Sequence, residues 1–404
     1  MEAIELLNAA RQEMAKRVVG QGEMVDGLLT ALIAGGHILL EGVPGLAKTR
    51  AVKTLAEITG LVFKRIQFTP DLLPADLTGT LVWEQATGAF SMRRGPVFAN
   101  VILADEINRA PAKVQSALLE AMEEKQVTIG EKSYPLPSPF FVLATQNPIE
   151  HEGTYALPEA ELDRFLLKLL VRYPDLEEEQ RILSFAAPFG EANNGGAIIG
   201  PEGEEHLAKG GAKHAVVKHE AARHDAARTG DARNDDANPD DAGHDAAALN
   251  AAGHDPAKIS DTKTGVAGSD SVLNPVLGHE ALRTLRQAAD AVFVDDQIQK
   301  YIVSVVAASR PAVSRPGAEK PGRTREGLYR YIAFGASPRA TIALYRCSKI
   351  RALFEGRAFV TPEDVKAAAF PVLRHRLVLS YEAEADGLES DTVVNRILTL
   401  VPMP

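Results

Sequence analysis

The chain has 404 residues, of which 45% are hydrophobic, and a formal net charge of −10 at pH 7. This length predicts two domains with apolar cores, and the acidic balance argues against a surface that binds nucleic acid. The single cysteine, Cys347, excludes an internal disulfide, and no apolar run approaches the roughly 20 residues of a membrane span or reads as a secretory signal. We therefore expect a cytoplasmic protein that does not insert into a membrane.

Residues 1–173 alternate short β-rich runs with helical patterns, which is typical of a parallel sheet covered by helices. The predicted strands are residues 37–42, 64–68, 101–106, 140–147 and 165–171. We therefore predict an α/β fold with a doubly wound parallel sheet. Ligands of such sheets bind beyond the carboxyl ends of the strands, so the residues after each strand are the candidate site residues.

A candidate phosphate-binding loop follows the first strand. Phosphate binding needs converging backbone N–H groups, a helix N-terminus, a lysine for the outer phosphates and a hydroxyl for Mg²⁺. We expect Lys48 to supply the amine, Thr49 to be a Mg²⁺ ligand, and Ala47, which stands where the common loop has glycine, to have an ordinary negative φ. The candidate ATP-binding residues of this loop are Gly42, Val43, Pro44, Gly45, Leu46, Ala47, Lys48, Thr49 and Arg50.

Polar side chains follow two further predicted strands. Asp105 and Glu106 stand at the end of the run 101–106, and Asn147 ends the run 140–147. An aspartate in this place can hold Mg²⁺, and the adjacent glutamate can polarise a water molecule that attacks the γ-phosphate. An amide such as that of Asn147 can orient the same water. The three residues together with the loop predict a site that binds Mg-ATP and hydrolyses it.

Two hairpins are predicted between these elements. Residues 79–96 alternate in polarity on both sides of a turn at residues 85–88, and residues 126–136 form a second candidate hairpin. We expect the first hairpin to contact a substrate or a partner protein.

Residues 190–275 differ in composition from the parts that flank them. They hold fifteen acidic and eight basic residues, no Phe, Trp or Tyr, and six of the ten histidines. Such a segment buries too little apolar surface to offset chain entropy, so we predict a disordered or weakly helical low-complexity insertion. The spacing of His214, His219 and His224 without any cysteine does not favour a metal site.

Residues 276–404 show the apolar spacing of helices. Ser337 and Thr361 are each followed by proline, which predicts that each is the N-cap of a helix. Arg339 would then lie in a first turn, where the helix dipole disfavours a cation unless a phosphate lies nearby. This part is predicted to be a separate helical domain.

Seven stretches of the chain form a longer and more specific pattern than any one of these motifs. They are residues 18–21, 39–49, 65–79, 95–100, 103–111, 144–148 and 152–165. Together they resemble the MoxR family of AAA+ ATPases, which commonly has alanine before the lysine of its phosphate loop. The resemblance implies an AAA+ ATPase core with a P-loop at residues 1–173 and an all-helical lid domain at residues 276–404, with the insertion at 190–275 between them.

The resemblance also implies roles for single residues. Val19, Gly20 and Gln21 are similar to the segment that lies against adenine. The Walker A, Walker B and first-sensor positions of the family correspond to Lys48, Thr49, Asp105, Glu106 and Asn147.

Three arginines match family positions or lie near them. Arg164 matches the arginine that reaches into the active site of a neighbouring subunit, and Arg109 is a second candidate for this boundary. Arg339 matches the second sensor, which contacts the γ-phosphate of an ATP molecule bound between core and lid. An arginine that acts on the active site of a neighbouring subunit implies a homo-oligomeric ring, and we expect a hexamer.

The function implied by the resemblance is chaperone-like remodelling or maturation of a partner protein complex, powered by Mg-ATP. The expected partner is a protein with a von Willebrand factor A domain, and this chain lacks the Asp-x-Ser-x-Ser signature of such a domain. Two alternatives stay open: a magnesium-chelatase-like motor subunit, and an AAA+ motor that acts on DNA or in transcription.

Overall fold

The computed structural model describes residues 2–43, 45–148, 154–185, 273–311 and 327–404. Pro44 lies outside the described residues, as does the predicted insertion at 190–275 except for its last three residues. The described residues on both sides of this gap belong to one compact unit. The predicted domain boundaries at 173 and 276 therefore stay predictions.

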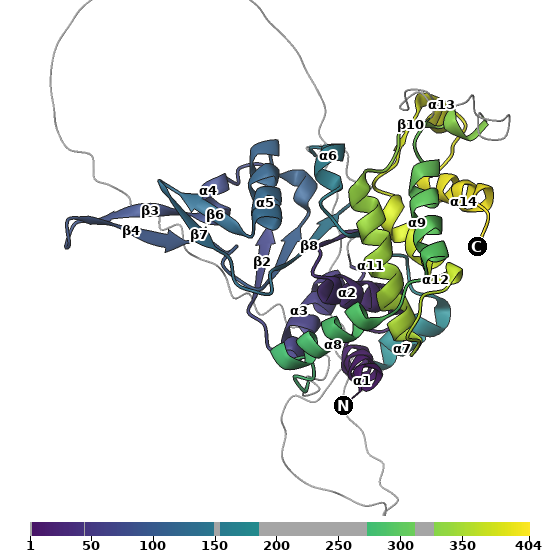
Figure 1. Ribbon diagram of the computed structural model, residues 1–404. Helices are drawn as coiled ribbons and strands as arrows, with labels where there is room; N and C mark the ends of the chain where they lie inside the picture. Colours follow the sequence, from purple (N-terminus) through teal and green to yellow (C-terminus); the bar gives the residue numbers. More distant parts are fainter. Residues whose placement is uncertain (1, 44, 149–153, 186–272, 312–326) are drawn as a thin grey trace, which may run out of the picture. The chain divides into compact units, whose positions relative to one another are not determined.

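A five-stranded parallel sheet forms the centre of the first part of the chain (Figure 1). Its order is β2 (Phe63–Gln67), β5 (Val101–Asp105), β8 (Phe141–Gln146), β1 (Ile38–Glu41) and β9 (Leu167–Leu170). All four neighbouring pairs are parallel, which confirms the predicted sheet. Because neighbouring strands run parallel, the chain must cross over the sheet between one strand and the next.

Side chains of alternate strand residues enter two different apolar cores. In β1, Ile38 and Leu40 pack into one core and Leu39 packs into the other. This period of two is expected for a strand that is buried on both faces. Helices α1 (Ala3–Ala15), α2 (Gly22–Ala34) and α3 (Lys48–Thr59) contribute to the first core, and α5 (Ala112–Glu124) contributes to the second. The prediction of a doubly wound sheet is confirmed.

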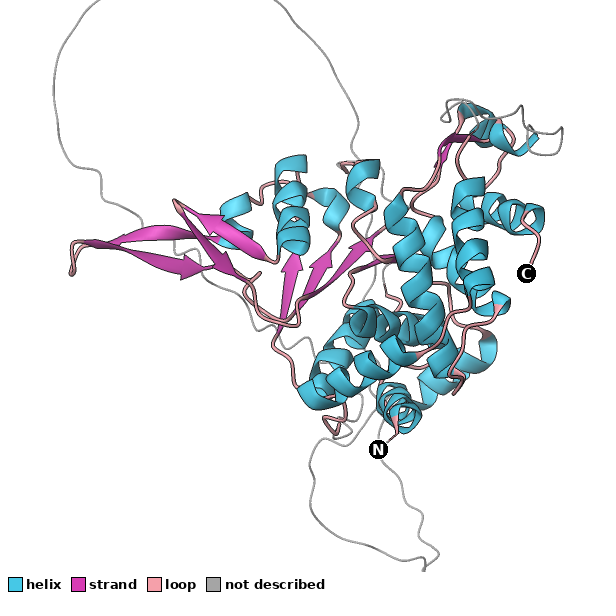
Figure 2. Ribbon diagram, viewed as in Figure 1, coloured by secondary structure: helices cyan, strands magenta, loops and turns pink. Residues whose placement is uncertain are grey.

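The two predicted hairpins are also confirmed. Strands β3 (Gly79–Glu84) and β4 (Ala89–Arg94) pair in one, and β6 (Gln126–Ile129) and β7 (Lys132–Pro135) pair in the other. Figure 2 shows both as antiparallel strands that extend beyond the central sheet. Near the turn of the first hairpin, the rings of Trp83 and Phe90 make an edge-to-face pair with centroids 5.0 Å apart, and both side chains are exposed.

The remaining helices of the first part are short or lie at its edges. They are α4 (Pro74–Thr78), the 3₁₀ helix η1 (Ile107–Arg109), α6 (Glu159–Leu162) and α7 (Leu176–Phe185). The second part is helical, with one small antiparallel pair of strands. Its elements are α8 (His279–Ala291), α9 (Asp296–Ala308), β10 (Ile332–Phe334), α11 (Pro338–Phe354), α12 (Pro362–Leu373), β11 (Val378–Leu379), α13 (Tyr381–Ala385) and α14 (Ser390–Leu400).

Both predicted N-caps are confirmed. The Ser337 hydroxyl accepts a hydrogen bond from the backbone N–H of Arg339 at 3.1 Å, and Thr361 forms a capping box with Asp364. These caps satisfy N–H groups that have no partner inside the helix.

The second part of the chain shares the first apolar core. Leu28 of α2, Leu285 of α8 and Leu344 of α11 are fully buried in one continuous cluster. The lid helices are therefore packed against the amino-terminal helices of the core. Among the described residues, no helix combines the length and apolarity that a membrane span requires.

Candidate functional site

The phosphate loop, residues 42–49, joins β1 to α3. The N–H of Gly42 donates to the carbonyl of Gln146 at 3.2 Å, and a Cβ on Gly42 would lie 2.7 Å from the carbonyl oxygen of Val171. Only glycine fits this close approach of two backbones. Gly45 has φ +89°, a left-handed conformation that glycine adopts without steric cost. The loop thus begins at the carboxyl end of a central strand and ends at the N-terminus of a helix.

Ala47 does not have the predicted conformation. Its φ is 54° and its ψ is 15°, so the expected negative φ is wrong. Ala47 is the N-cap of α3, and a left-handed residue in this position turns successive N–H groups toward one point, as in an anion-binding nest. The left-handed region costs a residue with a Cβ about 1–2 kcal/mol. The loop therefore holds Ala47 in a conformation that alanine by itself disfavours.

Lys48 lies across the loop, where its ammonium donates to the carbonyl of Gly42 at 2.6 Å. Burial lowers the pKa of Lys48, while the charges of Asp105 and Glu106 oppose this shift. Because β1, β8 and β5 are parallel neighbours, the lysine that follows β1 and the carboxylates at the end of β5 lie near the same edge of the sheet. We call this edge, where β1, β5 and β8 end, the carboxyl edge.

Thr145 connects the two acidic residues at this edge. Its hydroxyl donates to Oδ1 of Asp105 at 2.6 Å and accepts from the backbone N–H of Glu106 at 2.9 Å. Asn147 follows β8 and is buried. The three predicted residues are therefore gathered at the carboxyl edge, as the strand order requires.

Sequence reasoning did not find Arg65 and Gln67, which hold these carboxylates together with Arg109, a residue expected instead at a subunit boundary. Arg65 and Gln67 lie on the edge strand β2, and Arg65 contacts Oδ2 of Asp105 through Nη2 at 2.5 Å. Gln67 donates to Oε2 of Glu106 at 2.8 Å, and Nε of Arg109 lies 3.2 Å from the same oxygen. The sequence does contain a signal for them: Arg65 and Gln67 are polar residues two positions apart, and alternate residues of a strand face the same side.

The segment expected to lie against adenine is next to α7. Gly20 has φ +72°, and a Cβ there would lie 2.8 Å from the carboxyl group of Glu178. The amide of Gln21 donates to the carbonyl of Arg172 at 3.1 Å. Contacts from α7 and from Arg172, which follows β9, therefore fix this turn.

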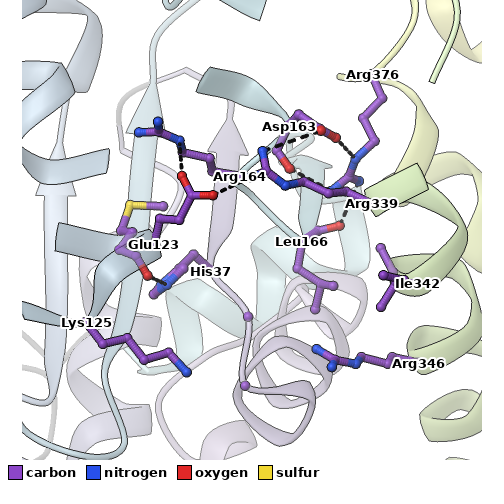
Figure 3. Close-up of a pocket in the computed structure, with 14 residues that line it drawn as sticks. His37, Glu123, Lys125, Asp163, Arg164, Leu166, Arg339, Ile342, Arg346 and Arg376 are labelled. Carbon is purple, nitrogen blue, oxygen red and sulfur yellow. Dashed lines mark hydrogen bonds and ion pairs between the residues drawn. The ribbon is translucent and has the colours of Figure 1, made fainter. Parts of the chain in front are cut away.

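Arg164 and Arg339 lie in a different place, a cavity of about 230 Å³ that we call the arginine cavity (Figure 3). Its wall includes His37 and Leu166, which immediately precede β1 and β9, and the N–H of Leu166 donates to the carbonyl of His37 at 2.8 Å. The cavity is therefore at the amino edge of the sheet. Strand β1 spans roughly 13 Å, and it separates this edge from the carboxyl edge.

This position corrects one expectation. The structure does not bring Arg339 to Lys48 of the same chain, although ATP was expected to bind between core and lid with Arg339 at its γ-phosphate. The physical reason is the packing of the lid: α11 packs against α2, and α12 against β9. The first turn of α11 therefore lies beside the connection between α6 and β9, which carries Arg164.

Charges in the arginine cavity are organised around two carboxylates. Oε2 of Glu123 lies 3.0 Å from Nε of Arg164, and its other oxygen contacts Nη2 of Arg339. Asp163 accepts from the buried Arg376 and from Ser337, each at 2.7 Å. Five cations line the cavity: Lys125, Arg164, Arg339, Arg346 and Arg376. The excess of five positive charges over two negative charges favours the binding of an anion in this cavity.

Comparisons with known proteins identify the family of the chain. The model of the ATPase family associated with various cellular activities matches residues 37–167, and an AAA lid domain matches residues 329–397. The chaperone MoxR1 of Mycobacterium tuberculosis is 38% identical over 401 residues, which cover 99% of this chain and 83% of that protein. The chain belongs to the MoxR family of AAA+ ATPases.

Two further relatives extend over nearly the full length. YeaC of Bacillus subtilis is 34% identical over 99% of this chain and 95% of its own. A solved structure from Cytophaga hutchinsonii, described as a candidate ATPase, is 37% identical with a TM-score of 0.71 and covers 100% of this chain and 96% of that chain. The expected P-loop AAA+ fold with a helical lid is thereby confirmed, and the family implies that the core binds a nucleotide.

Proposed function

We propose that this protein is an ATPase that hydrolyses Mg-ATP at the carboxyl edge. The observation that carries the proposal is that Lys48 at the start of α3 and Asp105 and Glu106 at the end of β5 lie at one edge of the sheet, with the left-handed Ala47 directly before Lys48. Thr49 and Asp105 offer the hydroxyl and carboxylate oxygens that Mg²⁺ prefers. Mg²⁺ bound there would neutralise charge on the β- and γ-phosphates.

Glu106 would act as the general base. It would accept a proton from a water molecule as that oxygen bonds to the γ-phosphorus, while the bond to the β–γ bridging oxygen breaks and ADP leaves. Gln67 and Arg109 now hold the carboxylate of Glu106, so at least one of these contacts has to be released for the carboxylate to face a water molecule. Asn147 would orient this water.

The second half of each active site would come from a neighbouring subunit. Arg164 and Arg339 lie together at the amino edge, so they cannot reach the Lys48 of their own chain. In a ring, the amino edge of one subunit could face the carboxyl edge of the next, and the cationic cavity would then meet the triphosphate. We propose a hexamer, a closed ring in which every site is completed in this way.

The work of the ring would be chaperone-like remodelling of a partner protein complex. The support is the similarity to MoxR1, whose name describes a chaperone, together with the exposed aromatic pair of Trp83 and Phe90 on a projecting hairpin. Aromatic side chains are common anchors in protein interfaces. A protein with a von Willebrand factor A domain is the proposed partner.

Two variants test the proposed ATPase. Lys48→Ala removes the ammonium that would contact the outer phosphates, so ATP affinity should fall about 10- to 100-fold. Glu106→Gln keeps the size of the side chain but cannot accept the proton, so ATP affinity should stay near that of the wild type while turnover falls at least about 100-fold. Binding is measured by calorimetry and turnover by phosphate release. Wild-type turnover in Glu106→Gln would contradict the role of Glu106.

A further inference from the structure

Glu123 joins two arginines that come from different parts of the chain. It lies in the last turn of α5, Arg164 lies between α6 and β9, and Arg339 lies in the first turn of α11. One carboxylate oxygen contacts Nε of Arg164 at 3.0 Å and the other contacts Nη2 of Arg339. Figure 3 shows the Glu123 carboxylate between the two guanidinium groups.

We propose that Glu123 is a positioning residue that holds Arg164 and Arg339 as one unit directed at the triphosphate of a neighbouring copy. The inference rests on the proposed ATPase function and adds a residue to its active site. Glu123 would not touch the nucleotide and would act only through the two arginines.

Electrostatics explain why a carboxylate is needed between the arginines. Two guanidinium cations in one cavity repel each other, and a shared anion offsets this repulsion while leaving a net positive charge for the phosphate. The contact to Arg164 uses the inner nitrogen Nε, so its two terminal amino groups stay available for phosphate oxygens. Among the described residues the Nε–H of Arg164 has no hydrogen-bond partner, so Glu123 holds this arginine by charge, and the terminal amino groups remain for phosphate oxygens.

Asp163 cannot replace Glu123 in this role. Its carboxylate already accepts hydrogen bonds from Arg376 and Ser337, each at 2.7 Å, and Nη1 of Arg339 lies 3.8 Å away from it. Among the described residues, Asp163 forms no ion pair with Arg164. Without Glu123, Arg164 would lose the one carboxylate that fixes its direction, and Arg339 would keep only the long contact to Asp163.

The effect on function can be separated from an effect on folding. The side chain of Glu123 is 37% exposed, that of Arg339 is 51% exposed and that of Arg164 is 27% exposed. Ion pairs with this exposure add little to folding stability, so Glu123→Gln should fold and melt like the wild type. Its ATP affinity should also be unchanged, because the residues at the carboxyl edge of its own chain remain intact. The expected defect is a lower kcat.

A mixing experiment shows whether this defect lies in the neighbour's site. Wild-type subunits are mixed with an excess of Glu106→Gln subunits, whose own sites are inactive but whose arginines are intact. In a second mixture the excess subunits carry Glu106→Gln with Glu123→Gln. In a third they carry Glu106→Gln with Glu120→Gln, a matched control because Glu120 is exposed on the same helix and lies outside the cavity.

Turnover per wild-type subunit should fall about 10- to 100-fold in the second mixture relative to the first and third, since small displacements of catalytic groups cost this much. When the excess subunits carry Glu123→Asp instead of Glu123→Gln, part of the rate should return, because aspartate keeps the negative charge. The Glu123→Asp variant also tests the role of Glu123 if the Glu123→Gln variant folds poorly. Equal turnover in all three mixtures would overturn the role of Glu123 while leaving the ATPase intact. Absence of turnover in the wild type alone would instead contradict the proposed function itself.

Discussion

Ala47 carries the backbone strain of the phosphate loop. Its left-handed conformation places a methyl group where only glycine is free of steric cost. Glu106 has a similar conformation, with φ 56°, directly after the strand that delivers Asp105. Strained residues that cluster at a site are held by the surrounding structure. Here both strained residues belong to the site that we propose for ATP.

Substitution of Ala47 by glycine measures this strain. Ala47→Gly should leave ATP affinity unchanged and should raise the free energy of unfolding by between zero and about 1 kcal/mol, since relief of strain is partly offset by the greater freedom of glycine in the unfolded chain. Chemical denaturation measures the effect.

The matched control is Ala51→Gly in the interior of the same helix, which should lower the free energy of unfolding by about 1 kcal/mol. A loss of stability in Ala47→Gly as large as in this control would contradict the role of the left-handed turn.

Single residues differ in how far the sequence predicts their place. Lys48, Asp105 and Glu106 could be placed together because each follows the carboxyl end of a strand, and parallel strands bring these ends to one edge. Glu123 and Arg376 could not be found in this way, since their partners depend on how helices pack. The conformation of Ala47 was also missed, because alanine at that position follows the family pattern and its backbone angles depend on the turn around it.

At the scale of elements, α5 connects the two halves of the proposed site. The helix follows η1, which begins after Glu106, and it ends at Glu124 beside the arginine cavity. Its 13 residues span about 20 Å, more than the length of β1. The helix therefore begins shortly after Glu106, the proposed base, and ends near Glu123, the proposed positioning residue.

The position of the lid could not be predicted from its helices. Residues on several sides of α11 are buried, including Leu344, Cys347 and Ile350. The apolar pattern of such a helix predicts burial but does not indicate which neighbour covers which side. The strands and hairpins were easier to predict than the position of the lid, because alternation along a strand and the sequence of a turn are local signals.

Truncation of Leu344 tests whether the lid and the core fold as one unit. Leu344→Ala should lower the free energy of unfolding by about 2–5 kcal/mol, because it opens a cavity in the apolar core that α11 shares with α2. Unfolding in urea, followed by circular dichroism, should remain a single transition.

Val303→Ala is the control, since Val303 is exposed on α9 and its truncation should change stability by no more than about 0.5 kcal/mol. Two separate transitions in Leu344→Ala would show that the lid unfolds independently.

At the scale of the whole molecule, the proposed function divides each active site between two subunits. The carboxyl edge carries the phosphate loop and the acidic residues, and the amino edge carries Arg164 and Arg339. A sheet strand separates the halves, so neither can complete the other within one chain. Activity should therefore depend on assembly, as expected for proteins that form closed rings.

The most direct test mixes two inactive variants. Arg164→Ala lacks the finger and Glu106→Gln lacks the base, so each alone should hydrolyse ATP at least about 100-fold more slowly than the wild type. In an equal mixture, an Arg164→Ala subunit has an intact base and can receive the arginine of a Glu106→Gln neighbour. With random assembly, roughly a quarter of the sites become complete, and turnover should recover toward that fraction of the wild-type rate. A mixture no more active than its separate components would contradict an active site shared between subunits.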